Sequence, residues 1–254
     1  MAGSDGKVFL GLEEISKILH DFRDFDSARI SGGEPFEHPA LQDIVGLANY
    51  NNRRVSILSC GVVQRKEVSV NRMDEIRDYV SDIIFSMHGT DPVHDQIVAN
   101  DKIYCRHPPY WDMLMDSADN ARTAGIPVSF QTVLMKDNLE SLEDIAHAVY
   151  CFNNFNHPGE YRASWHILRF VKQGRGLDNS DHAVEDKYLG YLARTVARLC
   201  KKYHLNISYS DSFGRHRCTA GELKAVVTCY GEVLPCSALK YGCQEGKFAC
   251  RNRL

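Results

Sequence analysis

Strand-like and helix-like segments alternate along most of the sequence, and this alternation restricts the fold more than any other feature. The strand-like segments are short and almost continuously apolar. The helical segments repeat apolar residues every three or four positions, as Leu142, Ile145, Ala146 and Val149 do. Such alternation predicts a parallel sheet covered by helices, which is an α/β fold. The expected strands cover residues 28–31, 54–58, 82–86, 127–134 and 165–171, and the expected helices cover 12–22, 39–51, 71–80, 110–124, 139–151 and 182–203.

The pattern changes after about residue 204. Residues 206–209 form a short strand-like segment, and two further strand-like segments, 224–228 and 232–234, flank Cys229-Tyr230-Gly231. Two such segments around a glycine-containing turn predict a β-hairpin. The sequence therefore predicts an α/β domain over residues 1–210, followed by a small cysteine-rich β-hairpin subdomain over residues 211–254.

Charge and hydropathy exclude several classes of partner. The formal net charge is -3 and the chain has no dense block of Lys and Arg, so nucleic acid is not expected as a principal partner. No stretch approaches the ~18 consecutive apolar residues that a membrane span requires, so no membrane partner is expected. The first residues lack the basic and apolar runs of a signal peptide, which predicts a cytoplasmic protein.

The cysteines are concentrated near the end of the sequence. The chain has nine cysteines, and five of them lie beyond residue 217. In a reducing compartment such a cluster favours metal ligation over disulfide formation. The candidate metal ligands in this segment are Cys218, Cys236, Cys243 and Cys250.

A run of small and acidic residues follows the first expected strand. The run is Ser31-Gly32-Gly33-Glu34-Pro35, and a helix is expected shortly after it. Two adjacent glycines leave the backbone N–H and C=O groups open to close approach by a small ligand. The run also lies at the carboxyl-terminal edge of a parallel sheet, where open α/β folds collect their ligands. We therefore expect a ligand site here, although a tight strand-to-helix turn would use the same residues.

Four segments, in this order, resemble the radical S-adenosylmethionine (SAM) superfamily, in particular its members with a SPASM or twitch extension. Ser31 to Pro35 is similar to the GGEP motif at the end of the second barrel strand. Phe85-Ser86-Met87-His88-Gly89 is similar to a segment of the fourth strand, with His88 where Asp is common. Residues 168–176 are similar to the exit of the sixth strand. The spacing from Cys218 through Gly231 to Cys236 is similar to the C-x9–15-G-x4-C opening of the extension.

The resemblance implies a fold, cofactors and an activity. The fold would be a partial (β/α)6 TIM-like barrel, with its second to sixth strands present and its first strand missing. SAM would be held by Ser31, Gly32, Gly33, Glu34 and Pro35, with Ser86 approaching the ribose. Cys218 and Cys236, with Cys243 and Cys250 completing the set, would hold an auxiliary 4Fe-4S cluster. The enzyme would modify a peptide or a small metabolite through a 5′-deoxyadenosyl radical, with electrons from a donor protein.

The sequence also departs from the family's pattern. The defining CxxxCxxC loop, which binds the SAM-cleaving cluster, is absent, and the SPASM/twitch-like subdomain is expected to be incomplete. Three alternatives therefore stay open. The chain could be a fragment of a radical SAM enzyme. It could be a cluster-less barrel that acts as a binding or scaffold module. It could also be an α/β protein that binds zinc through its cysteines and does not bind SAM. His88 and His94 could be ordinary loop histidines.

Overall fold

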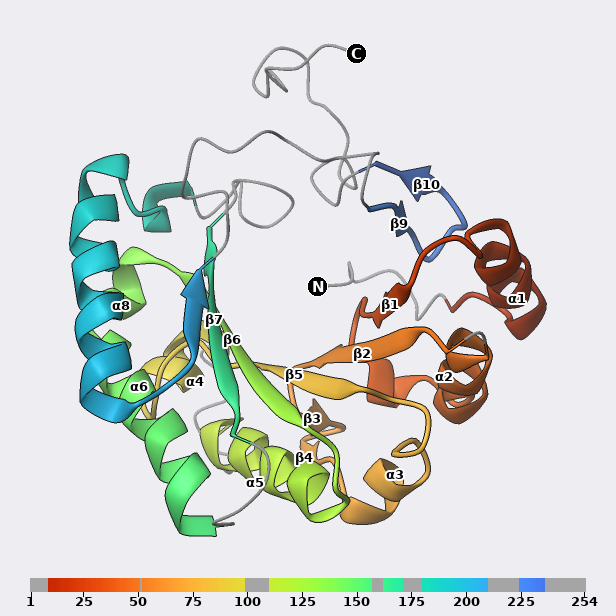
Figure 1. Cartoon of the computed structure of the whole chain (residues 1–254), viewed down its shortest axis with the longest axis horizontal. Helices are drawn as coiled ribbons and strands as arrows, with labels where there is room; N and C mark the ends of the chain where they lie inside the picture. Colours follow the sequence, from red (N-terminus) through yellow and green to blue (C-terminus); the bar gives the residue numbers. More distant parts are fainter. Residues whose placement is uncertain are drawn as a thin grey trace.

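The computed structural model of the chain describes residues 9–50, 52–98, 110–156, 162–170, 180–209 and 224–235, and a sheet of six strands forms its centre (Figure 1). All neighbouring strands of this sheet pair in parallel, and they follow one another in chain order. Between the second and third of these strands, the chain forms a small hairpin that lies outside the sheet. The strands, in spatial order, are β1 (Ser27–Ile30), β2 (Arg54–Ser59), β5 (Asp82–Ser86), β6 (Val128–Leu134), β7 (Ser164–Arg169) and β8 (Ile207–Tyr209).

Helices connect the strands and lie outside the curve of the sheet, as Figure 1 shows for α2, α5, α6 and α8. Parallel neighbours joined in order by helices are the arrangement of a β/α barrel, so the expected α/β partial barrel is confirmed. The helices are α1 (Leu12–Asp21), α2 (Leu41–Asn49), α3 (Val70–Asp74), α4 (Val93–Val98), α5 (Tyr110–Thr123), α6 (Leu142–Cys151) and α8 (Leu189–Tyr203). Shorter helical turns are η1 (Pro35–Glu37), η2 (Lys136–Asn138), η3 (Phe152–Asn156), η4 (Ser180–His182) and η5 (Asp186–Tyr188).

The two faces of the sheet differ because successive side chains of a strand point to opposite sides. The face that packs against the helices is apolar and buried, and the ring of Phe130 meets that of Phe152 from η3 at 5.2 Å. The opposite, concave face carries most of the polar strand residues. The buried outer residues include Val55, Ile57, Ile83, Phe85, Phe130, Trp165 and Ile167, and the polar inner residues include Ser56, Asp82, Ser86, Ser129, Gln131, Ser164, His166 and Ser208.

A buried arginine fastens the first helix to the sheet. Arg53, which directly precedes β2, donates hydrogen bonds to the carbonyl oxygens of Leu19 (2.7 Å), Phe22 (3.1 Å) and Phe25 (3.0 Å). The last carbonyls of a helix lack partners within the helix, so the guanidinium satisfies groups that would otherwise need water. Arg53 therefore fixes the end of α1 and the following turn beside β2.

The structure extends and corrects the expected elements. Residues 207–209 join the main sheet as its sixth strand, whereas five strands were expected. The helix expected over residues 71–80 ends at Asp74, because Ile76 and Tyr79 bond to carbonyls three residues earlier and so continue the chain as turns. The helix expected from residue 182 begins at Leu189. A hairpin of β3 (Val62–Val63) and β4 (Lys66–Glu67) was not expected.

The expected hairpin near the end of the chain is confirmed: β9 (Val226–Val227) pairs antiparallel with β10 (Val233–Leu234), and Gly231 in the turn has a φ of 78°. The division into domains at residues 210 and 211 stays a prediction. Within the described ranges, no helix is long and apolar enough to span a bilayer.

Candidate functional site

The turn after β1 presents bare backbone at the carboxyl-terminal edge of the sheet. Ser31, Gly32 and Gly33 are exposed, and Gly32 has a φ of 145°, a conformation that strongly favours glycine. A Cβ atom placed on Gly32 would meet no other atom within 4 Å. The glycine is therefore required by the backbone conformation, and the space beside it is open.

Glu34 holds this turn against the end of β2. Its carboxylate accepts hydrogen bonds from Ser59 Oγ (2.8 Å), from the Cys60 backbone N–H (2.8 Å) and from the Phe36 backbone N–H (3.2 Å). Three of the roughly four acceptor positions of a carboxylate are thus occupied by the protein itself. Pro35 is buried at the start of η1. Of the five residues expected to hold SAM, Glu34 and Pro35 therefore shape the turn, and Ser31, Gly32 and Gly33 are exposed to solvent.

The environment of Glu34 changes the protonation of two groups. Burial raises the pKa of the Glu34 carboxyl, and the hydrogen bonds from Cys60, Ser59 and Phe36 act in the opposite direction. Burial, followed by the nearby charge of Glu34, raises the pKa of the Cys60 thiol to about 12. Cys60 is therefore a neutral thiol at physiological pH, and its Sγ contacts the Val62 carbonyl oxygen at 3.4 Å.

A second group of candidate residues lies where β5 and β6 end, at the same edge of the sheet. Ser86 is the last residue of β5 and is half-buried, with Gln131 as its partner on β6. Beyond it, the buried Asn138 donates hydrogen bonds to the carbonyl oxygens of His88 and Val133, both at 2.9 Å. Asn138 thus ties the exits of the two strands together and fixes the backbone that follows Ser86.

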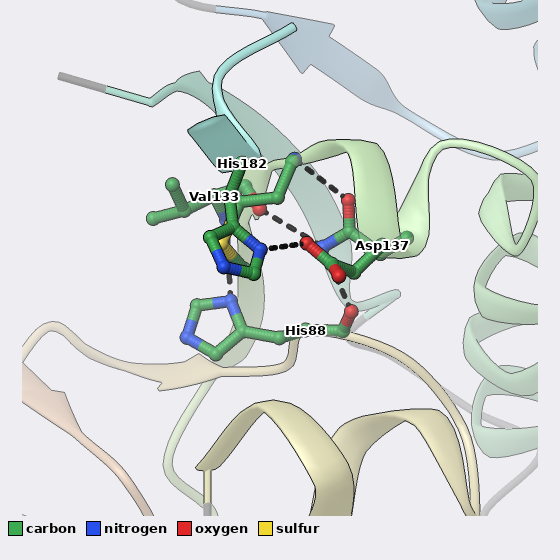
Figure 2. A network of polar contacts seen from close by, with 6 residues as sticks. His88, Val133, Asp137 and His182 are labelled. Atoms are coloured by element: carbon green, nitrogen blue, oxygen red, sulfur yellow. Dashed lines mark hydrogen bonds and ion pairs between the residues drawn. The ribbon is translucent and has the colours of Figure 1, made fainter. Parts of the chain in front are cut away.

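His88 and His94 each accept a hydrogen bond from a backbone N–H group through Nδ1. His88 Nδ1 accepts a hydrogen bond from the Val133 N–H at 3.3 Å (Figure 2). His94 Nδ1 accepts a hydrogen bond from the His88 N–H at 3.2 Å. Burial lowers the pKa of His88 to about 4, and burial together with the charge of His88 lowers the pKa of His94 to about 3. Both rings are therefore neutral at physiological pH, and His94 lies in α4 rather than in a loop.

A third contact brings a distant segment to this edge. Figure 2 shows His182, from η4, against the carboxylate of Asp137 on η2, and a hydrogen bond joins Nδ1 of His182 to Oδ2 of Asp137. An isolated bridge between Met135 and Ala183 supports the same contact through the backbone. The segment around His182 therefore borders the exit of β6.

The expected metal site cannot be placed. Cys218, Cys236, Cys243 and Cys250 lie outside the described residues. Among the residues that the structure does describe, no group of three or more His, Cys, Asp or Glu side chains could hold a metal ion. The auxiliary cluster therefore stays a prediction.

Sequence reasoning missed two residues that shape the site. Ser59 bonds to Glu34 across 25 positions, and Asn138 bonds to His88 across 50 positions. A polar residue at or shortly after the end of a parallel strand was the available signal in each case. The signal does not identify the partner, because Glu34 and His88 lie in segments that follow other strands.

Comparison with known proteins agrees with this geometry. Residues 3–149 match the family model described as the radical SAM superfamily. Over 133 residues, 52% of this chain and 34% of the relative, the sequence is 26% identical to a PqqA peptide cyclase from Streptomyces rochei.

Solved structures with the same fold include SuiB from Streptococcus suis. The crystal structure of SuiB bound to its precursor peptide SuiA superposes with a TM-score of 0.69 at 15% identity, covering 98% of this chain and 57% of SuiB. SuiB bound to S-adenosylmethionine gives a TM-score of 0.68 at 13% identity, covering 93% and 55% of the two chains. This chain thus spans about a third of the curated relative and just over half of SuiB.

The family match covers more than half of the chain, and the parallel six-stranded sheet has the fold of known members. The chain therefore belongs to the radical SAM superfamily.

Proposed function

We propose that this chain is the SAM-binding barrel of a cytoplasmic radical SAM enzyme that modifies a peptide. Family membership supports the radical SAM chemistry. The peptide is favoured over a small metabolite because one relative is named a peptide cyclase and another was solved with a precursor peptide. The chain covers only part of these relatives, so the activity proposed is that of the complete enzyme.

The exposed Gly32-Gly33 turn carries this proposal. Its open backbone lies at the carboxyl-terminal edge of a parallel sheet, where ligands of such folds bind. The main chain of Ser31, Gly32 and Gly33 would hold the amino-acid end of SAM, with Glu34 and Pro35 fixing the turn and Ser86 near the ribose. In this family, bound SAM supplies a 5′-deoxyadenosyl radical that removes a hydrogen atom from the substrate. The barrel's own contribution is to bind, orient and exclude water.

The iron–sulfur part of the chemistry is not assigned to residues described in this structure. Family membership implies SAM and an iron–sulfur cluster as cofactors. The sequence contains no CxxxCxxC, and the described residues hold no metal-binding group. We further propose that Cys218, Cys236, Cys243 and Cys250 hold an auxiliary 4Fe-4S cluster of a SPASM or twitch subdomain. A donor protein would supply the electrons.

The same observation favours a second candidate function. A barrel without a SAM-cleaving cluster could act as a binding or scaffold module that presents a substrate to an active partner. The two candidates differ in the formation of 5′-deoxyadenosine, which only the first allows in the complete enzyme.

Isothermal titration calorimetry with SAM tests the proposed site. Gly32→Ala would place a methyl group in the open space beside the turn, and we expect at least about tenfold weaker SAM binding. Gly125→Ala is the matched control, because Gly125 also has a positive φ (80°) and open space but lies at the opposite edge of the sheet, between α5 and β6. Equal weakening by both variants, or no binding by the wild type, would contradict the proposal.

A further inference from the structure

Gln131 is a buried polar residue on the concave face of the sheet. Its neighbours in β6, Phe130 and Thr132, point the other way: Phe130 packs against Phe152, and Thr132 Oγ1 accepts a 2.8 Å hydrogen bond from Trp165 Nε1. Because side chains alternate along a strand, Gln131 points into the barrel. The residue is 8% exposed.

Within the described part of the chain, the carboxamide of Gln131 has no hydrogen-bonding partner. The side chain of Gln131 makes no hydrogen bond to any described residue. Among the described residues, His38 Nε2 is the only side-chain atom that is both unpaired and fully buried, so the amide atoms of Gln131 keep some contact with solvent. The amide is therefore nearly enclosed by protein but still reachable from the barrel interior. A carboxamide in this position is open to water or to a ligand, and a ligand that offers its own donor and acceptor can replace the water there.

Polar neighbours extend this position into a row across four strands. Ser86 on β5 is opposite Gln131, Gln131 is opposite His166 on β7, and His166 is opposite Ser208 on β8. His166 Nδ1 and Ser208 Oγ are hydrogen-bonded at 2.7 Å. Adjacent strands lie about 4.8 Å apart, so the row is roughly 14 Å long, about the length of four extended peptide residues.

We propose that Gln131 recognises the main chain of a peptide substrate that lies across β5, β6 and β7 inside the barrel. A carboxamide offers an acceptor and two donors side by side, which complements the C=O and N–H groups of a peptide. The row is uncharged apart from the titratable His166, which suits neutral amide groups better than an anionic ligand. This inference rests on the proposed function, because it takes the substrate to be a peptide.

The test uses the full chain, saturated with SAM, and an immobilised array of random-sequence hexapeptides as the probe. The peptide that the wild type binds most tightly is then measured in solution by fluorescence anisotropy. Gln131→Leu should weaken its binding about tenfold, equivalent to about 1.4 kcal/mol, and leave SAM affinity unchanged. Gln42→Leu makes the same chemical change at an exposed position of α2 and should alter neither affinity.

A second measurement reads the carboxamide directly. The chain has six glutamines, and selective ¹⁵N labelling gives one side-chain NH₂ pair for each. The pair missing from Gln131→Leu assigns Gln131, and in the wild type this pair should shift when the hexapeptide is added. Circular dichroism confirms that the variant is folded.

Several results would overturn the inference: no peptide captured by the wild type, equal peptide binding by Gln131→Leu and wild type, or a loss of SAM binding in place of peptide binding. Failure of the proposed function looks different, because the wild type would then not bind SAM whatever the residue at position 131.

Discussion

Glu34 Oε1 accepts a 2.8 Å hydrogen bond from Ser59 Oγ, which connects the glycine-rich turn after β1 to the last residue of β2. Ser59 is buried, and its Oγ also accepts a bond from the Gly61 N–H at 2.9 Å. The loops that follow two neighbouring strands are thus held by one pair of side chains. This pair positions the exposed backbone of Gly32 and Gly33 without itself facing the open space.

Removing the charge of Glu34 should make Cys60 more reactive. In Glu34→Gln the carboxylate that helps to raise the pKa of the Cys60 thiol is gone, so the pKa should fall from about 12 and the thiolate fraction should rise. We expect the rate of Cys60 alkylation by iodoacetamide at pH 8 to rise about tenfold, measured by mass spectrometry of the Cys60 peptide. Alkylation of the exposed Cys229 is the internal control. An unchanged Cys60 rate would show that Glu34 does not control this thiol.

His88 and His94 should make the fold sensitive to mild acid. The pKa values of His88 and His94, about 4 and about 3, lie below the ordinary value of 6.5, so in mild acid the unfolded chain takes up protons that the folded chain does not. Their contribution is complete above about pH 7 and is lost as the pH falls toward 4, by about 2 kcal/mol for each histidine at pH 5.

Urea unfolding at pH 7 and pH 5 measures this dependence. His94→Asn keeps a hydrogen-bond acceptor near the position of Nδ1, but it removes the buried ring, so the variant should be less stable than the wild type at pH 7. Because Asn does not titrate, the free energy of unfolding of the variant should fall by about 2 kcal/mol less than that of the wild type between pH 7 and pH 5. Parallel pH profiles for the two proteins would contradict the assignment.

Arg53 should matter far more to stability than its neighbour Arg54. Arg53→Met keeps the apolar stem but leaves the carbonyls of Leu19, Phe22 and Phe25 without the guanidinium, and we expect a loss of about 2 kcal/mol in the free energy of unfolding. Arg54→Met is the matched control, since the Arg54 side chain is 74% exposed and pairs with Asp26 only at 3.7 Å, and it should cost less than about 0.5 kcal/mol. Similar losses in both variants, measured by chemical unfolding, would refute the role of Arg53.

The parts of the fold that the sequence predicted are those with strong local patterns. The strand at residues 82–86 has the expected bounds because Ile83, Ile84 and Phe85 form an uninterrupted buried run. The β3–β4 hairpin was missed because its two turn residues, Gln64 and Arg65, have φ values of 50° and 64°. Two-residue turns with positive φ values usually contain Asn-Gly or Asp-Gly, so the pair Gln64-Arg65 does not predict a hairpin.

The position of the glycine-rich turn at the end of β1 was predicted from the sequence, but the contacts of the turn were not. The glycine-rich turn was predicted because two consecutive glycines after a strand indicate a turn with an open backbone. The inward position of Gln131 depends on which face of β6 the helices cover, and Phe130 and Thr132 on either side do not reveal this from their sequence alone. The sixth strand was not assigned to the sheet because only three residues, Ile207–Tyr209, take part.

This chain should not generate 5′-deoxyadenosine by itself. It contains no CxxxCxxC to hold the cluster that the family uses for SAM cleavage. After reconstitution with iron and sulfide, incubation with SAM and dithionite should give no 5′-deoxyadenosine above the protein-free level in liquid chromatography with mass detection. Product formation would show that another set of residues holds the SAM-cleaving cluster.

The most direct measurement is a crystal structure of the chain grown with SAM. We expect the methionine end of SAM to lie against the main chain of Gly32 and Gly33, within hydrogen-bonding distance, with the ribose near Ser86. SAM bound elsewhere, or a turn left empty under conditions where calorimetry shows binding, would contradict this assignment of the site.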